Sequence, residues 1–299
     1  MERFSGKMLY CAERGDTHRG EGRGTGTGYP ETVCRKYQDI KKKRRGGMYQ
    51  YLTMEKQDGI ALITFRRPGQ LNAMNRAFMD EIIDAFHCAN EDEEVKAVLV
   101  TGEGRAFMAG ADIKEYAAQT DEEFLAFQKK GWKLYDEAEK GSKPFIAVVN
   151  GFALGGGFEI AAACDMIIAG EDAVFGLPEV HLGLVPGGGG TQRLVQKLGI
   201  NRVREMLYLG GKYPADEMLQ WGVVNYVVPA DRLQDFARDI AAKITRRSPK
   251  AIAQLKRLAY LSTCPIPLEE RMEEEGKSLY ELFHTPEAQK KIQDFVNKE

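Results

Sequence analysis

The segment that most constrains this chain is residues 147–159, which read AVVNGFALGGGFE. Its valines predict a strand, and the small residues after the three glycines predict a helix from residue 157. Glycines let the backbone pass close to a ligand, and the N–H groups at a helix start have no partner within the helix. Because Glu159 falls in the first helical turn, the segment predicts a hole for a negatively charged oxygen with a carboxylate beside it.

A second glutamate, Glu179, ends the turn-like segment FGLPE at residues 175–179. Each feature has a purely structural alternative, since glycine triplets serve helix–sheet packing and a glutamate in a first turn complements the helix dipole. Two carboxylates beside an oxyanion hole are what chemistry through an enolate requires, namely an acid, a base and donors for the developing charge. The combination therefore favours a catalytic site.

Composition limits the remaining possibilities. The chain has 299 residues, 43% of them hydrophobic, which is enough for one large domain or two modest ones. A net charge of −2 gives no overall bias toward nucleic acid or an anionic membrane. No apolar run approaches the ~20 residues that span a bilayer. Five cysteines without a Cys-x-x-Cys pair are typical of reduced thiols, so we predict a cytoplasmic protein without membrane association.

Residues 1–47 differ from the rest of the chain. They carry 12 Lys/Arg against 6 Asp/Glu, and they lack a sustained apolar period. Such a segment cannot offset its ordering entropy, so we predict a disordered basic extension, with Met48 as the functional start. Its acidic residues argue against a mitochondrial transit peptide. The basic run at residues 41–45 leaves RNA binding open as an additional role, although such a run is usually a solvated tail and nucleic acid is an improbable partner.

From residue 49 onward, strands alternate with helices, which predicts an α/β fold. Helix-capping residues are expected at Asn75 and Thr120. After residue 231 the pattern is helical to the chain end, so this part needs a partner surface. The predicted strands cover residues 60–65, 97–101, 145–149, 166–169 and 223–228. The predicted helices cover 76–89, 121–139, 157–163, 191–197, 215–221, 231–247, 249–261, 267–283 and 286–297.

Four ordered motifs between residue 49 and the chain end resemble the enoyl-CoA hydratase/isomerase, or crotonase, superfamily. They are GRAFMAGADI at 104–113, NG at 150–151 with GGGFE at 155–159, FGLPE at 175–179 with LGL at 182–184, and PGGGGTQRL at 186–194. The glycines at 187–190 also resemble a phosphate cradle, but no Lys-Ser/Thr follows them, so a nucleotide P-loop is not expected.

The resemblance implies a crotonase-like spiral core of ββα repeats over residues 48–230, followed by a helical oligomerisation domain over 231–299. It implies assembly as a trimer, or as a hexamer made from two trimers, and an acyl-CoA substrate of lipid metabolism. Neither a metal nor a separate cofactor is expected, because coenzyme A is part of the substrate.

The resemblance also places site residues on this chain. The thioester oxygen would lie between the backbone N–H groups of Ala109 and Gly156, and Ala111, Asp112, Ile113 and Lys114 would line the CoA site. Asp112 would also fix its own loop. His181, two residues after Glu179, is expected to be structural.

The two glutamates favour a hydratase, a hydro-lyase that adds water to a trans-2-enoyl-CoA and gives 3-hydroxyacyl-CoA. Glu159 would be the base toward water, and Glu179 the acid that delivers the proton to the α-carbon. Phe158, like Met108, is bulkier than the small residue that is common at its position, so we expect a reshaped acyl pocket that favours short chains. The alternatives are an enoyl-CoA delta-isomerase, which needs only one such acid/base, and a hydratase for an unusual enoyl-CoA.

Overall fold

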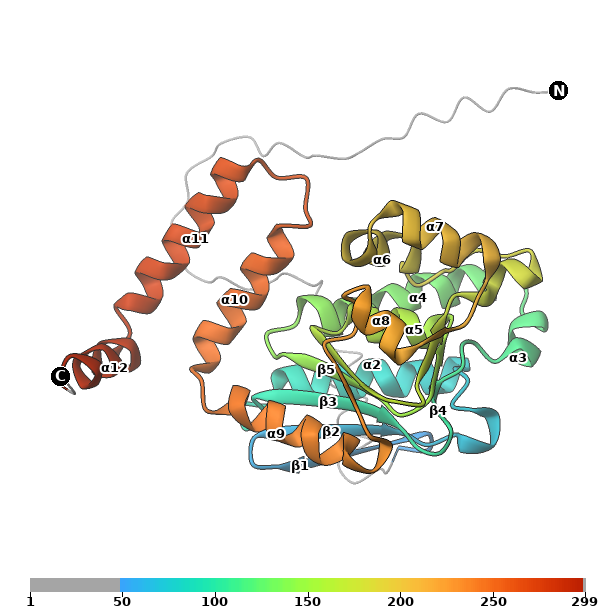
Figure 1. The fold of residues 1–299 in the computed structure, drawn as a ribbon, viewed down its shortest axis with the longest axis horizontal. Helices are drawn as coiled ribbons and strands as arrows, with labels where there is room; N and C mark the ends of the chain where they lie inside the picture. Colours follow the sequence, from blue (N-terminus) through green and yellow to red (C-terminus); the bar gives the residue numbers. More distant parts are fainter. Residues whose placement is uncertain (1–48, 298–299) are drawn as a thin grey trace. The chain divides into compact units, whose positions relative to one another are not determined.

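The computed structural model describes residues 49–297. The predicted basic extension at 1–47 and the predicted start at Met48 lie outside these residues. The parallel β-sheet and the helices that cover it confirm the predicted α/β class (Figure 1).

The main sheet has six strands in the order β1-β2-β3-β5-β7-β10. β1 pairs antiparallel with β2, and all the other neighbours are parallel. Every residue of β3 and β5 is buried, as expected for parallel strands that are covered on both faces. The strands are β1 (Leu52–Gln57), β2 (Ile60–Phe65), β3 (Ala97–Gly102), β5 (Phe145–Val149), β7 (Met166–Gly170) and β10 (Tyr226–Val228).

A second, smaller sheet of four strands has the order β4-β6-β8-β9. Three of its strands follow a main-sheet strand directly: β4 (Ala106–Met108) follows β3, β6 (Phe152–Leu154) follows β5, and β8 (Val174–Gly176) follows β7. β9 (Tyr213–Pro214) closes the edge, antiparallel to β8. The chain therefore winds from one sheet to the other and returns through helices, which confirms the predicted spiral of ββα repeats.

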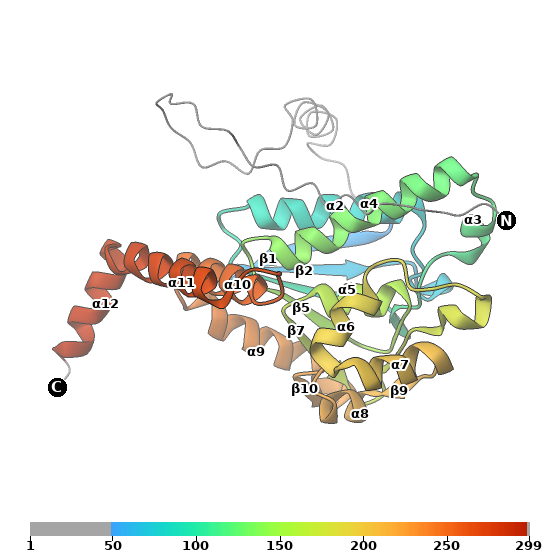
Figure 2. The ribbon, with the colours of Figure 1, turned by 90° about the horizontal axis from the view of Figure 1, so that it is seen from above.

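Helices cover both faces of the main sheet. α2 (Arg76–Glu91) and α4 (Asp121–Lys140) pack against each other on one face (Figure 2). Both predicted caps are confirmed, since Asn75 accepts from the Phe78 N–H at 2.8 Å and Thr120 from the Glu123 N–H at 3.2 Å. α9 (Leu233–Thr245) packs its apolar face against β3 and β5 on the other face, so the packing of the core extends to α9.

α5 (Gly156–Ala163) contacts strands of both sheets. Seven of its eight residues are buried, among them the predicted catalytic Glu159. The central position of this short helix explains its small side chains, because alanine and glycine allow strands to approach from two sides. The short helices α3 (Ile113–Ala117), α6 (Gly190–Leu198), α7 (Ile200–Leu209) and α8 (Ala215–Gln220) complete this part of the chain.

The last three helices are α10 (Pro249–Leu261), α11 (Leu268–Phe283) and α12 (Pro286–Val296). α10 and α11 lie side by side in both views (Figures 1 and 2). Lys256 fixes α10 to the core, since its Nζ donates to the carbonyl oxygens of Ala138 and Lys143 and to Asp165 Oδ2, at 2.6 to 2.8 Å. Large apolar side chains remain exposed on the other two helices, including Leu268, Met272, Leu279, Tyr280 and Phe295.

The boundaries of β10 differ from the prediction, which began this strand at residue 223. The backbone N–H groups of Val223 and Val224 instead donate to the Met218 carbonyl, which closes the end of α8. Within residues 49–297, no helix is long and apolar enough to cross a membrane.

Candidate active site

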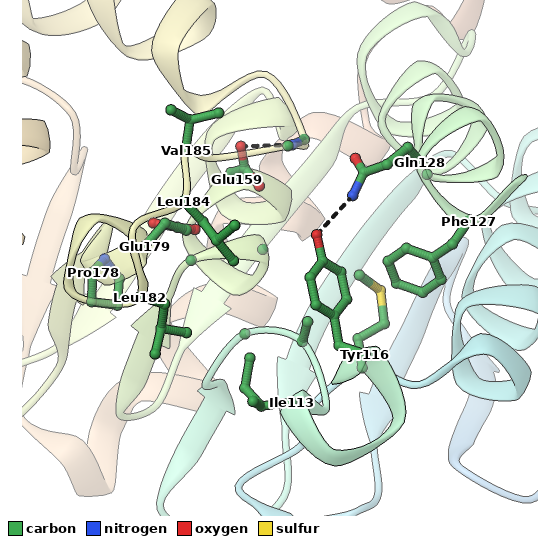
Figure 3. A pocket seen from close by; sticks show the side chains of 18 of the residues that line it. Ile113, Tyr116, Phe127, Gln128, Glu159, Pro178, Glu179, Leu182, Leu184 and Val185 are labelled. Carbon is green, nitrogen blue, oxygen red and sulfur yellow. Dashed lines mark hydrogen bonds between the residues drawn. The ribbon is translucent and has the colours of Figure 1, made fainter. Parts of the chain in front are cut away.

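A cavity of about 210 Å³ lies where the N-terminus of α5, helix α4, the loop before α3 and the segment 178–188 meet. Both predicted catalytic glutamates line it. Figure 3 shows Glu159 and Glu179 on one side, with Tyr116, Phe127 and Gln128 opposite. Segments that are far apart in sequence therefore bring the two carboxylates to one enclosed space.

Glu159 is held by the glycine loop at residues 187–190. Glu159 is only 3% exposed. Its Oε1 atom accepts hydrogen bonds from the N–H groups of Gly188 and Gly190, at 2.8 and 2.7 Å. Burial raises the pKa of Glu159, whereas these two donors and the nearby Arg193 guanidinium oppose that shift. The second oxygen, Oε2, accepts from neither glycine.

The glycine loop has a function that the sequence analysis missed. It cradles a carboxylate of the protein itself rather than a phosphate. A Cβ on Gly188 would clash with the Tyr135 hydroxyl and lie 2.6 Å from Glu159 Oε2. The signal in the sequence was the glycine run itself, which allows the backbone to approach Glu159 closely.

Glu179 lies in the 3₁₀ helix Pro178–Leu182. Its Oε2 is buried and has no hydrogen-bond partner among the described residues. Burial raises the pKa of Glu179 to about 7, and the charge of Glu159 contributes in the same direction. Glu179 is therefore substantially protonated near neutral pH, as a general acid must be.

Gly155 brings Glu179 close to the N-terminus of α5. Gly155 has φ +52° and ψ −125°, a conformation that glycine adopts readily, and a Cβ there would lie 2.8 Å from Glu179 Oε1. Gly156, by contrast, has ordinary space around a Cβ, with its nearest neighbours at 3.7 and 4.0 Å. Protein packing therefore requires Gly155, whereas a requirement for Gly156 would come from a bound ligand.

The predicted oxyanion role of Ala109 does not fit the geometry. The Ala109 N–H already donates to the Leu71 carbonyl at 3.0 Å. Ala111 forms an isolated parallel bridge with Met74, in which the Met74 N–H donates to the Gly110 carbonyl and the Asp112 N–H donates to the Met74 carbonyl. The N–H of Ala111 takes no part in these bonds and has no acceptor among the described residues. The N–H of Gly156, the first residue of α5, likewise has no acceptor among the described residues. Ala111 and Gly156 both line the cavity, so each can offer its N–H group to a ligand there.

Phe158 is not a pocket residue, which corrects the prediction that it binds substrate. Its side chain is fully buried and packs edge-on against Phe175, with ring centroids 5.2 Å apart. Helix geometry explains why Phe158 faces the core while Glu159 faces the cavity, because neighbouring side chains lie about 100° apart around the axis of α5. Met108 is likewise buried in the core, so neither residue can shape the acyl pocket directly.

The other predicted binding residues lie between the cavity and a neighbouring hollow. Ala111 and Ile113 border both, whereas Asp112 and Lys114 border only the hollow. Asp112 forms an ion pair with Arg67 at 3.1 Å, so it ties its loop to a side chain rather than to nearby backbone. His181 Nε2 lies 3.1 Å from the Gly210 carbonyl and does not line the cavity, in agreement with its expected structural role.

Three further polar residues of the cavity escaped the sequence analysis. Tyr135 is 4% exposed, and its ring lies under the Arg193 guanidinium at 5.2 Å. Tyr116 accepts a hydrogen bond from Gln128 Nε2 at 3.3 Å (Figure 3). They come from α3 and α4, where helical periodicity indicates only which side chains face inward.

Among the described residues, no group of three or more His, Cys, Asp or Glu is placed to hold a metal ion.

Comparison with known proteins agrees with this architecture. The family model for enoyl-CoA hydratase/isomerase matches residues 55–299. The chain is 38% identical over 246 residues to a probable mitochondrial enoyl-CoA hydratase of Dictyostelium discoideum, which covers 82% of this chain and 88% of the relative. It is also 38% identical to a short-chain-enoyl-CoA hydratase of Clostridium acetobutylicum, with 82% and 94% covered.

A solved structure of an enoyl-CoA hydratase subunit from Geobacillus kaustophilus superimposes with a TM-score of 0.80 at 36% identity, over 85% of this chain and 97% of that one. The chain therefore belongs to the enoyl-CoA hydratase/isomerase family, which confirms the resemblance seen in the four motifs.

Proposed function

We propose that this protein is a hydro-lyase that reversibly adds water to a short trans-2-enoyl-CoA and gives 3-hydroxyacyl-CoA. One observation carries the proposal: Glu159 and Glu179 face one cavity whose wall also presents the free N–H groups of Ala111 and Gly156. Base, acid and oxyanion donors are thus gathered around a single space.

In the proposed reaction the thioester oxygen accepts from the Ala111 and Gly156 N–H groups. Ionised Glu159 takes a proton from water, whose oxygen bonds to the β-carbon, and the double-bond electrons move toward the thioester. Protonated Glu179 then delivers its proton to the α-carbon. Preformed donors stabilise the enolate-like charge without reorganising, and losing one typically costs about 3 kcal/mol of barrier. These groups supply every step, so the proposal needs no cofactor.

The environments of the glutamates support this division of roles. Glu159 receives two N–H donors, which favour its charged form, whereas Glu179 has a buried oxygen without a partner. Burial raises the pKa of Glu179 to about 7, although a hydrogen bond from its own backbone N–H opposes that shift. Because the two charges interact, measured pKa values will belong to the pair.

The test is the loss of crotonyl-CoA absorbance with wild type, Glu159→Gln and Glu179→Gln. Glutamine keeps the size of the side chain and can still accept from the glycine loop, so the loop need not move. We expect both variants to lose several orders of magnitude in kcat, and Glu171→Gln, at an exposed position, to lose nothing. Full activity in either active-site variant would refute the mechanism. Conversion of a 3-enoyl-CoA without hydration would instead indicate an isomerase.

The preference for short acyl chains is supported by the cavity size of about 210 Å³ and by the name of the Clostridium relative. Leu184 lies beside the two glutamates, and Phe127 lies on the opposite wall of the cavity (Figure 3). We expect kcat/KM to be higher for crotonyl-CoA than for decenoyl-CoA. The opposite order would contradict this part of the proposal.

The neighbouring hollow is the proposed site of the CoA phosphates. Arg66, Arg67 and Lys114 surround it, and Ala111 and Ile113 connect it to the cavity. We expect Lys114→Met to raise KM for crotonyl-CoA about 5-fold without lowering kcat, since the change removes one phosphate contact. The N-acetylcysteamine thioester of crotonic acid, which lacks phosphates, serves as the control, and its KM should not respond.

Self-association through α10–α12 is the last part of the proposal. The exposed apolar side chains of α11 and α12 are of the kind that oligomer interfaces bury. We expect light scattering during size-exclusion chromatography to give the mass of a trimer or a hexamer. A monomer at micromolar concentration would contradict this expectation.

A further inference from the structure

The wall of the cavity opposite the glutamates is unexpectedly polar. Tyr116, Gln128 and Tyr135 line it together with apolar residues such as Met79 and Phe127. These three side chains have no role in the proposed hydration of a substrate with a plain alkyl chain. A purely hydrocarbon chain would be matched better by an apolar wall, because buried polar groups without partners are costly.

Tyr116 and Gln128 are rigidly placed. The Tyr116 ring packs edge-on against Phe124 and Phe127, with centroid distances of 5.3 and 6.1 Å. Gln128 lies against Gly187, where a Cβ would be 2.6 Å from the amide oxygen. Packing thus holds both side chains at the cavity wall, where the hydrogen bond joins them into a pair.

The pair leaves hydrogen-bonding capacity unused. Because the Tyr116 oxygen accepts from Gln128 Nε2, its own O–H proton is available for another acceptor. No acceptor for this proton is found among the described residues. Burial also raises the pKa of Tyr116, so the hydroxyl stays protonated at any working pH. The cavity thus presents a neutral donor to whatever occupies it.

The charge of the cavity limits what that occupant can be. Among the described residues that line it, none is Lys, Arg or His, and the only charged side chains are the two glutamates. A terminal carboxylate on the acyl chain would meet no cation and would be repelled by the ionised Glu159, which is unfavourable in a partly desolvated site. The complementary group is therefore an uncharged oxygen.

We propose that the acyl pocket selects a short 2-enoyl-CoA whose chain carries a neutral oxygen, a carbonyl or a hydroxyl, bound by the Tyr116–Gln128 pair. This inference rests on the proposed hydratase activity and deepens it by naming the substrate class. A site built around polar groups discriminates against an analogue that lacks the matching group, because its donors are then left unpaired. One such hydrogen bond corresponds to a preference of about 10-fold.

The test compares kcat/KM for three substrates of equal chain length: 2-hexenoyl-CoA, 5-oxo-2-hexenoyl-CoA and the 2-hexenoyl-CoA that ends in a carboxylate. In wild type we expect the 5-oxo substrate to exceed the alkyl substrate about 10-fold, and the carboxylate to be the poorest. The 5-hydroxy analogue tests whether a hydroxyl is accepted as well as a carbonyl.

The variants Tyr116→Phe and Gln128→Met remove the pair one partner at a time. We expect the ratio of 5-oxo to alkyl kcat/KM to fall to about 1 in each. A ratio is used because a general loss of activity or folding cancels from it. Tyr213→Phe is the matched control, a tyrosine buried against Trp221 outside the cavity, and it should keep the wild-type ratio.

Two failures are distinguishable. If wild type hydrates no enoyl-CoA, crotonyl-CoA included, the proposed function fails. If it hydrates crotonyl-CoA but uses the alkyl substrate as well as the 5-oxo substrate, or if the ratio survives in both variants, only the polar acyl pocket is overturned.

Discussion

Arg193 donates a hydrogen bond to the carbonyl oxygen of Gly188 at 2.6 Å, and the N–H of Gly188 donates to Glu159. The guanidinium is itself fixed by two hydrogen bonds to Glu139, at 3.0 and 2.8 Å. A chain of contacts thus runs from α4 through Arg193 and the glycine loop to the proposed base. Arg193 is a positioning residue, since it acts on Glu159 through the loop and through its charge.

Replacing Arg193 should separate these two effects. Arg193→Met removes a cation that lowers the pKa of Glu159, so that pKa should rise. Because the base must be ionised, the acidic limb of the kcat/KM profile should then move to higher pH. Arg193→Lys keeps the charge but loses the two-bond geometry, so we expect about a 10-fold lower kcat with a smaller shift. The measurement is the pH profile of crotonyl-CoA hydration. An unmoved acidic limb in Arg193→Met would exclude the electrostatic role.

The pH dependence of wild type follows from the protonation of the glutamate pair. Hydration needs Glu159 ionised and Glu179 protonated, so kcat/KM should fall as pH rises through about 7, where Glu179 loses its proton. Dehydration needs the same total number of protons on the pair. Because the reaction takes up no net proton, the profiles of the two directions must have the same shape. Rates measured from pH 5 to 9 in both directions check this, and opposite alkaline limbs would contradict a shared proton.

Glu179 should also lower the stability of the folded protein at neutral and alkaline pH. Its pKa rises from 4.5 to about 7 on folding, so folding favours the protonated form. The contribution of Glu179 to the free energy of unfolding is therefore fully present below pH 4.5 and is lost as the pH rises through about 7. With allowance for partial exposure, Glu179→Gln should be more stable than wild type by about 1–2 kcal/mol at pH 8. At pH 4 the two should be equal. Urea unfolding at both pH values is the measurement, with Glu171→Gln as the control, and an equal gain at both pH values would contradict the assignment.

Lys256 should be important for stability rather than for chemistry. It is an almost fully buried amine, with its side chain 6% exposed, that joins α10 to Asp165 and two core carbonyls. Lys256→Met preserves the apolar stem but leaves Asp165 without its cation, which we expect to cost about 3 kcal/mol. Adding Asp165→Asn should recover part of the loss, because it neutralises the partly exposed carboxylate that has lost its cation. Urea unfolding of the two variants tests this, and a double variant less stable than Lys256→Met would contradict the coupling.

Much of the fold could be predicted from local sequence. The strands at 60–65 and 145–149 and the helix at 249–261 lie at the predicted positions, because apolar runs and prolines mark them clearly. The second sheet escaped prediction. β4, β6 and β8 are three residues long, too short to show a period of two. They are strands only because the spiral stacks them beside one another.

The site was predicted unevenly, for a related reason. The motifs singled out Glu159, Glu179 and Gly156, whose residue types are chemically distinctive. They led to Ala109 rather than Ala111 as an oxyanion donor, because the hydrogen bond from Ala109 to Leu71 joins segments almost 40 residues apart and is not visible in a local motif. Nor could they show that Phe158 faces the core, since both sides of α5 are buried.

The sequence by itself determined the α/β alternation, the family and the residue types that carry acid–base chemistry, because these depend on local pattern and composition. Only the tertiary structure decided which backbone N–H groups remain free, which side chains face the cavity, and that a glycine loop holds Glu159. Those properties depend on contacts between segments distant in the chain. The same contacts set the burial that raises the pKa of Glu179, and burial is a property of the folded surroundings rather than of the residue.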